Sequence, residues 1–276
     1  MHFPWQRTDI LTDARKQFWA NHGYLVLSGF FKPKEVRAVN GVIDRILANP
    51  NTLGDATIDV LHGEHRGKRL RGADAPVEAF RGPLKINDLF LQEPEVRHLA
   101  LNERLTRILT QLLDGAPMVC NSLNFLWGSQ QPDHFDTWYM PPIVENKLAV
   151  SSICLEHVSP DAGPLVYYPG THKIPPYRFS HGGIHAVDHE MPLCRAYVQE
   201  QLEKTKAQAQ QFLGHAGDVF IWHGQLLHGG TVIKEPSRTR KTLVTHYWRA
   251  QDVEPERVAQ VHRTGYYLKR EHQPVG

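Results

Sequence analysis

His134 and Asp136 lie two residues apart in the stretch HFD, and their types and spacing fit metal chemistry. In an extended strand, residues i and i+2 point to the same face, so this imidazole and carboxylate would converge on one point. Two histidines and one carboxylate on one face form the facial triad that binds non-haem Fe(II) and leaves coordination positions open. An H-x-D pair also arises often by chance, and a surface turn is the alternative interpretation. The pair therefore needs a second histidine from elsewhere in the chain.

The segment 217–229, GDVFIWHGQLLHG, contains two candidates for that second histidine. A strand pattern leads through a turn to His228, which glycine follows, so that backbone can approach a bound ligand closely there. His228 lies 228 − 136 = 92 residues after Asp136, which is enough chain to cross a β core and return. His223 is the rival, although a turn histidine bonded to backbone or water is the favoured interpretation for it.

Two arginines, Arg238 and Arg240, come just before a strand pattern at 241–248. A guanidinium at the start of a core strand could present its planar fork to a carboxylate. The two residues would share one face of an extended chain, so this pattern alone leaves them as rivals. A solvated arginine at a strand end is the alternative interpretation for each.

The elements that must position these residues change character along the chain. Helix signals dominate the first part, with a short strand pattern at 24–27 and weak periodicity over 50–92. The second part has short β-type runs between turn signals, which favour a sandwich or barrel. The sequence thus predicts one α+β domain. Helices are expected at 12–21, 33–49, 93–113 and 192–212, and strands at 118–127, 147–157, 165–168, 218–222 and 241–248.

The composition excludes several classes of protein. The chain has 276 residues, 31 Lys+Arg against 29 Asp+Glu, 41% hydrophobic residues and 17 histidines. Balanced charge argues against a disordered chain and against a nucleic-acid binder. No apolar run reaches the roughly 20 residues of a membrane span, and no signal peptide is apparent. The three cysteines form no C-x-x-C pair, so we expect a cytoplasmic protein without a disulfide scaffold.

A family resemblance rests on the Glu156-His157 pair and the stretch DAGPLVYYPGTHK at 161–173. With these residues the chain resembles the phytanoyl-CoA dioxygenase family of Fe(II)/2-oxoglutarate oxygenases. The resemblance continues through GDVFIWHGQLLHGG and RKTLVTHYW and back to the N-terminal helix and YLVLSGFF. It covers most of the chain, and several motifs in this order are far more specific than any one of them.

Carried over residue by residue, the resemblance makes His134, Asp136 and His228 the iron ligands. It makes Arg240 the partner of the 2-oxoglutarate C5 carboxylate. Arg240 lies 12 residues after His228, one more than is common in the family, but the strand KTLVTHYW aligns only with this choice over Arg238. The resemblance also suggests two polar residues near the cosubstrate, Asn124 and Thr231.

The resemblance implies a double-stranded β-helix core (jelly-roll, cupin-like) with flanking N-terminal helices. We expect a single domain over 1–276, with a helical part at about 1–115, a β core at about 116–250 and a tail at 251–276. The implied activity is hydroxylation of an unactivated C–H bond in a small-molecule or acyl-thioester substrate, using O2 and releasing succinate and CO2. The presence of Asp136 argues against the related halogenases, which lack this carboxylate.

Substrate contacts are the least specific part of the prediction, and the sequence leaves the oligomeric state open. Aromatic residues near the expected site could line a pocket, or could be ordinary core residues: Phe125, Trp138, Tyr139 and Trp222, with Met140 beside them. The segment 174–212 is the expected substrate cover, because long loops in compact domains are often functional. The basic stretch 62–71 could hold coenzyme A phosphates, with a solvated loop as the alternative.

Two other classes of protein stay open. One is a non-catalytic member of the fold, which would be expected to lack an intact ligand set. The other is a cupin-type metal-binding protein, which would need neither Arg240 nor 2-oxoglutarate.

Overall fold

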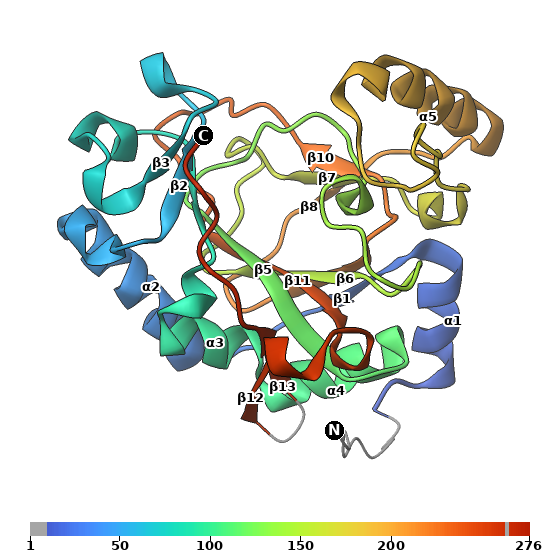
Figure 1. Ribbon diagram of the computed structural model, residues 1–276, viewed down its shortest axis with the longest axis horizontal. Helices are drawn as coiled ribbons and strands as arrows, with labels where there is room; N and C mark the ends of the chain where they lie inside the picture. Colours follow the sequence, from blue (N-terminus) through green and yellow to red (C-terminus); the bar gives the residue numbers. More distant parts are fainter. Residues whose placement is uncertain (1–9, 263–264) are drawn as a thin grey trace.

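A computed structural model of the chain describes residues 10–262 and 265–276. Two largely antiparallel sheets and five α-helices form the framework of this structure (Figure 1). Within the described residues, no helix has the length and apolar character needed to cross a membrane. The expected α+β class is therefore confirmed as a mixture of helices with antiparallel sheets.

The main sheet has ten strands, and most of its neighbouring strands are antiparallel. Strand β13 is the exception, because it pairs in parallel with β5 and antiparallel with β12. The other strands follow in the order β1 (Tyr24–Leu27), β9 (Val219–His223), β6 (Ala149–Cys154), β11 (Thr242–Arg249), β5 (Pro117–Phe125), β4 (Leu84–Asn87), β2 (Thr57–Val60) and β3 (Arg69–Arg71), while β12 and β13 span Val258–His262 and Gly265–Leu268.

A smaller sheet has three strands in the order β10 (His228–Gly230), β7 (Leu165–Tyr167) and β8 (Gln210–Phe212). One histidine of the expected metal site thus lies in this sheet. Figure 1 shows the smaller sheet above the central strands of the main sheet, with α5 (Met191–Thr205) beside it. The two sheets therefore lie on opposite sides of the space that contains the site.

Helices cover the other side of the main sheet. Helix α2 (Pro33–Ala48) buries Val36, Val39 and Ile43 at helical spacing, and packs with α3 (Pro94–Ala100) and α4 (Glu103–Leu113) on the main core. Helix α1 (Asp13–His22) begins at Thr12, whose hydroxyl accepts a hydrogen bond from a backbone N–H. It ends at Gly23, whose left-handed φ of 76° is typical of a C-cap.

Strand alternation divides the main sheet into a helix side and a site side. Ile86, Asn124 and Leu243 are direct partners across β4, β5 and β11, and two of them belong to the core under the helices. The next residues along, including Leu123 and Val244, point the other way and line a cavity. The central strands of the sheet are thus buried on both faces, and their polar residues, such as Ser122, Asn124 and His246, are buried as well.

The structure differs from the sequence prediction in the first 115 residues. The region 50–92 contributes three short strands, β2, β3 and β4, to the main sheet, so this part is not only helical. Strands of three or four residues with charged side chains give too few positions for a period to be visible. The predicted helix at 93–113 is two helices, because the chain breaks at Leu101 and Asn102 caps α4. The predicted helix at 192–212 ends at Thr205, and β8 follows.

Candidate active site

A cavity of about 660 Å³ opens on the site side of the main sheet. Its lining includes His134, Asp136 and His228, together with Arg240. These residues come from a loop and the 3-10 turn that follows it, from β10 of the smaller sheet and from the loop just before β11. The cavity therefore joins residues that are more than 100 positions apart in the sequence, since 240 − 134 = 106.

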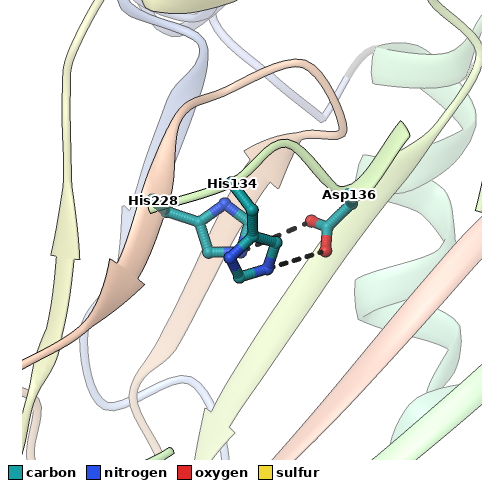
Figure 2. A group of neighbouring side chains, drawn as sticks. All are labelled: His134, Asp136 and His228. Carbon is teal, nitrogen blue, oxygen red and sulfur yellow. Dashed lines mark ion pairs between the residues drawn. The ribbon is translucent and has the colours of Figure 1, made fainter. Parts of the chain in front are cut away.

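His134 and His228 lie against each other through a pair of backbone hydrogen bonds. The N–H of His134 donates to the carbonyl of His228 at 2.8 Å, and the N–H of His228 donates back at 3.1 Å. Their imidazole rings lie with centroids 4.4 Å apart. This isolated bridge fixes the two side chains on one side of the cavity (Figure 2).

Each of these imidazoles is held in one tautomer. The Nδ1 of His134 lies 2.8 Å from the carbonyl oxygen of Pro132, and the Nδ1 of His228 lies 2.9 Å from that of Leu226. A carbonyl oxygen can only accept, so each Nδ1 must carry the proton and donate it. Both Nε2 atoms are therefore left with a free lone pair that faces Asp136.

Asp136 completes the cluster from a short 3-10 turn that begins at its own position. Its carboxylate oxygens lie 3.9 Å from the Nε2 of His134 and 3.7 Å from the Nε2 of His228 (Figure 2). The three ligand atoms lie within 4.8 Å of one another, and all three residues are buried. Two imidazole nitrogens and one carboxylate around one point are a donor set that suits a divalent transition metal.

Two further side chains orient the carboxylate. The indole Nε1 of Trp222 donates to Oδ2 of Asp136 at 2.7 Å, and the Nε2 of His246 lies 3.1 Å from Oδ1. Both partners are buried strand residues, from β9 and β11. Hydrogen bonds of this kind to a metal-binding carboxylate fix its orientation and its charge.

Protonation equilibria in the cluster favour metal binding. Burial, reinforced by the neighbouring His228, lowers the pKa of His134 to about 4, so that its ring is neutral at neutral pH. Burial opposes ionisation of Asp136, but His228 and His246 outweigh it and hold the pKa of this carboxyl well below its usual range. Near pH 7, His134 is therefore neutral and Asp136 is ionised, the states in which an imidazole and a carboxyl group bind a metal.

Arg240 is the buried cation of the cavity, and Arg238 is not part of it. Arg240 is 6% exposed and lines the cavity, whereas Arg238 is exposed to solvent and lies outside the lining. Among the described residues no carboxylate pairs with Arg240, and its Nε has no hydrogen-bond partner. Burial lowers the pKa of Arg240 to about 10, which still leaves it charged at neutral pH. An unpaired buried guanidinium is costly unless a ligand supplies the missing anion.

The structure separates the other predicted site residues into two groups. Phe125, Tyr139, Met140 and Trp222 line the cavity. Trp138 does not, because it packs with Phe135 and the residues of α5 in a separate core cluster.

The predicted cosubstrate residues Asn124 and Thr231 also lie away from the cavity. Asn124 is on the helix side of β5, since alternation along that strand sends its side chain away from Leu123 and Phe125. The hydroxyl of Thr231 donates to the carbonyl of Pro164 at 3.0 Å. The sequence pattern could not show which face of the sheet Asn124 lies on or which loop carbonyl the Thr231 hydroxyl binds.

His223 is a structural residue and His246 is the site residue that the sequence prediction missed. The Nδ1 of His223 accepts a hydrogen bond from the backbone of Gln225 at 3.0 Å, outside the cavity lining. His246 lies on the same face of β11 as Val244 and Trp248, and all three residues line the cavity. A histidine on the cavity face of an apolar strand is the signal that could have identified it.

The predicted substrate cover, residues 174–212, does not line the cavity. Every residue from 174 to 212 is described, and none of them lines the cavity. The cavity is instead lined by Arg257, Leu268, Arg270 and Gln273 from the last part of the chain. Of the basic stretch 62–71 only Arg69 reaches the cavity, and two hydrogen bonds from its guanidinium go to Asp59.

The fold and this cluster together define the chain as a protein of helices and antiparallel sheets with a candidate centre for a divalent transition metal. A sequence model of the family described as phytanoyl-CoA dioxygenase (PhyH) matches residues 19–241. The match extends over most of the chain, so the chain belongs to the PhyH family. The family resemblance carried by the sequence motifs is thereby confirmed.

Two characterised relatives are similar in sequence. The chain is 26% identical over 184 residues to the ectoine dioxygenase of Sphingopyxis alaskensis, a match that covers 63% of this chain and 54% of the relative. It is 20% identical over 258 residues to the peroxisomal phytanoyl-CoA dioxygenase of Bos taurus, covering 88% of this chain and 70% of that protein. The matched part is thus little more than half of the first relative's length.

Two solved structures share the fold. EctD from S. alaskensis with bound Fe has a TM-score of 0.64 at 17% identity, covering 91% of this chain and 81% of EctD. The non-haem α-ketoglutarate-dependent carbocyclase SnoK from nogalamycin biosynthesis has a TM-score of 0.66 at 16% identity, covering 94% of this chain and 97% of SnoK. At such identities the likeness concerns the fold, and the site must be judged from its own residues.

Proposed function

We propose that the chain is an Fe(II)/2-oxoglutarate-dependent dioxygenase that hydroxylates an unactivated C–H bond and releases succinate and CO2. His134, Asp136 and His228 would hold the iron, and Arg240 would bind the C5 carboxylate of 2-oxoglutarate. The observation that carries the proposal is the combination of a buried two-histidine, one-carboxylate cluster with a buried unpaired arginine in the same cavity.

Arg240 is what separates this proposal from the alternatives. A cupin-type metal protein that uses no oxoacid has no need for a buried cation beside its metal ligands, and a guanidinium left without an anion would destabilise it. A non-catalytic member of the fold would not be expected to keep all three ligands together with the two side chains that orient Asp136. A 2-oxoglutarate-dependent oxygenase has a role for every one of these groups.

The chemistry is divided between the cofactor and the protein. When bound, Fe(II) supplies the coupling of oxidative decarboxylation of 2-oxoglutarate by O2 to hydroxylation of the substrate. The histidines provide their Nε2 lone pairs, and the Nδ1 bonds to Pro132 and Leu226 keep those lone pairs aimed at one point. Trp222 holds the Asp136 carboxylate in place at Oδ2.

Arg240 orients the cosubstrate through its planar fork. Burial makes this ion pair stronger than it would be in water, and the ring of Phe125, 5.9 Å from the guanidinium carbon, covers it on one side. The protein thus places the oxoacid and excludes water.

We infer that the substrate is a small molecule or the acyl part of a thioester. The cavity volume of about 660 Å³ lies in the range of small-molecule sites. The relatives named above, an ectoine dioxygenase and a phytanoyl-CoA dioxygenase, represent these two kinds of substrate. Phe125, Tyr139 and Trp222 are the aromatic residues that we assign to its walls, with Met140 beside them.

We further propose that the two sheets form a double-stranded β-helix within one domain that spans residues 1–276. The support is that the smaller sheet and the main sheet share the site between them, and that β1 from the first part of the chain pairs with β9 from the second. The helices of the first part pack on the same main sheet.

An anaerobic titration tests the proposal directly. Fe(II) and 2-oxoglutarate added together should give a visible metal-to-ligand charge-transfer band, and admission of O2 should release succinate. Arg240→Leu should keep metal binding but require much more 2-oxoglutarate for the band. Absence of the band from the folded, iron-loaded wild-type protein would contradict the proposed use of 2-oxoglutarate.

A further inference from the structure

We propose that residues 265–276 form the substrate-side wall of the cavity and determine substrate specificity, with Asp88 as the anchor that holds this wall in place. The inference rests on the proposed function, since it concerns the same cavity. We call residues 265–276 the wall segment.

The wall segment contributes three side chains to the cavity: Leu268, Arg270 and Gln273. In Figure 1 it begins with β13 and then runs up to the region of β2 and β3, where the C mark lies. None of these residues is an iron ligand or the proposed 2-oxoglutarate partner. The segment can therefore shape the cavity without altering the groups that do the chemistry.

Asp88 is fully buried, and its two carboxylate oxygens bind two different parts of the chain, β5 and the wall segment. Its Oδ1 accepts hydrogen bonds at 3.1 Å from the Asn121 side chain and from the backbone N–H of Ser122, both on β5. Its Oδ2 accepts from the guanidinium of Arg270 and, at 3.0 Å, from the amide of Gln273. One carboxylate thus joins the main sheet to the two polar side chains of the wall segment.

Two backbone contacts hold the ends of the wall segment. Tyr266 and Tyr267 pair in parallel with β5. At the other end, the N–H of Arg69 donates to the carbonyl of Gly276 at 2.9 Å, and the N–H of Gly276 donates back at 3.1 Å. Between these points, Asp88 binds both polar side chains of the segment, and the Nε of Arg270 also donates to the carbonyl of Cys120 at 3.2 Å. The segment is therefore fixed at its ends and in its middle, directly beside the cavity.

Two findings mark the wall segment as a specificity element. It lines the cavity, whereas none of residues 174–212, the cover predicted from the sequence, does so. It also lies outside residues 19–241, the part that the family model matches. The iron cluster and Arg240 lie inside that part. The chemistry thus belongs to the matched region, and the shape of the substrate space belongs partly to residues beyond it.

Asp88→Asn tests the anchor with little change in shape. Asp88 has a left-handed φ of 56°, which asparagine tolerates, and the remaining amide oxygen can still accept from Asn121 and Ser122. The new NH2 group then faces the donors of Arg270 and Gln273, so only the wall side of the anchor is lost. Asp252→Asn is the matched control, because Asp252 also binds an arginine, Arg249, through two hydrogen bonds but lies outside the cavity lining.

Amide hydrogen exchange measures how firmly Asp88 holds the wall segment. In Asp88→Asn, amide exchange in residues 269–276 should accelerate by about tenfold or more, while β5, β6 and β9 keep wild-type rates. In Asp252→Asn, residues 269–276 should exchange as in wild type. Unchanged exchange of 269–276 in Asp88→Asn would overturn the anchor, as would fast exchange of this segment already in wild type.

Gln273→Leu tests specificity, with Gln208→Leu on an exposed loop as its control. A panel of acyl thioesters, amino acids and small metabolites is screened for stimulated succinate release. For any stimulating compound, Gln273→Leu should change its KM about tenfold while the KM for 2-oxoglutarate stays within about twofold. Equal KM values for the compound in both variants and wild type would refute the specificity role. A missing charge-transfer band in wild type would refute the proposed function instead, and the anchor would still be judged by exchange.

Discussion

His134 and His228, 94 residues apart (228 − 134), are joined by two reciprocal backbone hydrogen bonds of 2.8 and 3.1 Å. Their imidazoles are thereby fixed side by side before any metal binds, with both Nδ1 protons given to backbone carbonyls. Asp136 follows His134 by two residues, and its carboxylate reaches the same point from the 3-10 turn that begins there. The two histidines are thus preorganised by main-chain contacts, whereas Asp136 is oriented by the side chains of Trp222 and His246.

Removal of the carboxylate ligand should abolish turnover. Asp136→Ala takes away the anionic ligand and is expected to lower succinate release to background, because the remaining histidines alone hold Fe(II) weakly. Succinate is quantified after incubation with Fe(II), 2-oxoglutarate and O2. Asp133→Ala is the control, since Asp133 bonds Tyr168 at 2.7 Å and lies outside the cavity lining. Unchanged succinate release from Asp136→Ala would contradict the ligand assignment.

Loss of the indole donor should weaken iron binding without removing a ligand. Trp222→Phe keeps an aromatic ring but deletes the 2.7 Å hydrogen bond to Asp136, and an affinity loss of about 10- to 100-fold is expected. Fe(II) affinity is measured by anaerobic titration. Trp248→Phe also removes an indole N–H at the cavity, one that bonds only the Met140 carbonyl at 3.4 Å, and should have little effect. Equal losses in the two variants would argue against an orienting role.

Arg240 should govern the affinity for 2-oxoglutarate. A charge-assisted hydrogen bond contributes about 1.5 to 3 kcal/mol, so Arg240→Leu is expected to raise the KM for 2-oxoglutarate roughly 10- to 100-fold. Arg238→Leu makes the same change at the exposed rival position and should leave this KM near wild type. Initial rates of succinate release at varied 2-oxoglutarate give both values. A larger effect at Arg238 would exchange the two assignments.

The stability of the metal-free protein should fall as the pH falls from about 6.5 to 4, partly because of His223. Burial is the main cause that lowers the pKa of His223 to about 4, while an unfolded histidine titrates near 6.5. Between these values the unfolded chain binds a proton that the folded chain does not, so the stabilisation is present above pH 6.5 and is lost toward pH 4.

His223→Gln should reduce this pH dependence. We expect its urea midpoint to change less between pH 7 and 4.5 than that of wild type, by the equivalent of about 2 kcal/mol. Chemical unfolding at both pH values measures the difference. His181→Gln, on an exposed loop, is the control and should follow wild type. If the urea midpoint of His223→Gln changes with pH as much as that of wild type, other groups account for the loss of stability.

The sequence predicted much of the fold because its signals were local. The strand at 24–27 is observed at those residues as β1, and the predicted helix from Pro33 is α2. The core strands were recognisable as apolar runs between turns. The short strands β2, β3 and β4 at one end of the main sheet were missed, since their pairing depends on partners across the sheet and their own residues carry almost no period.

The sequence by itself determined which residue types were present for chemistry and where the family motifs stood, including H-x-D and the histidine of the GQLLHGG stretch. Only the tertiary structure decided that His228 and Arg240 face the cavity while His223 and Arg238 do not, and that residues 265–276 rather than 174–212 line it. The physical reason is that a strand pattern specifies alternation but not which face meets which partner. That choice depends on strand pairing between residues far apart in the chain, as in the bridge between His134 and His228.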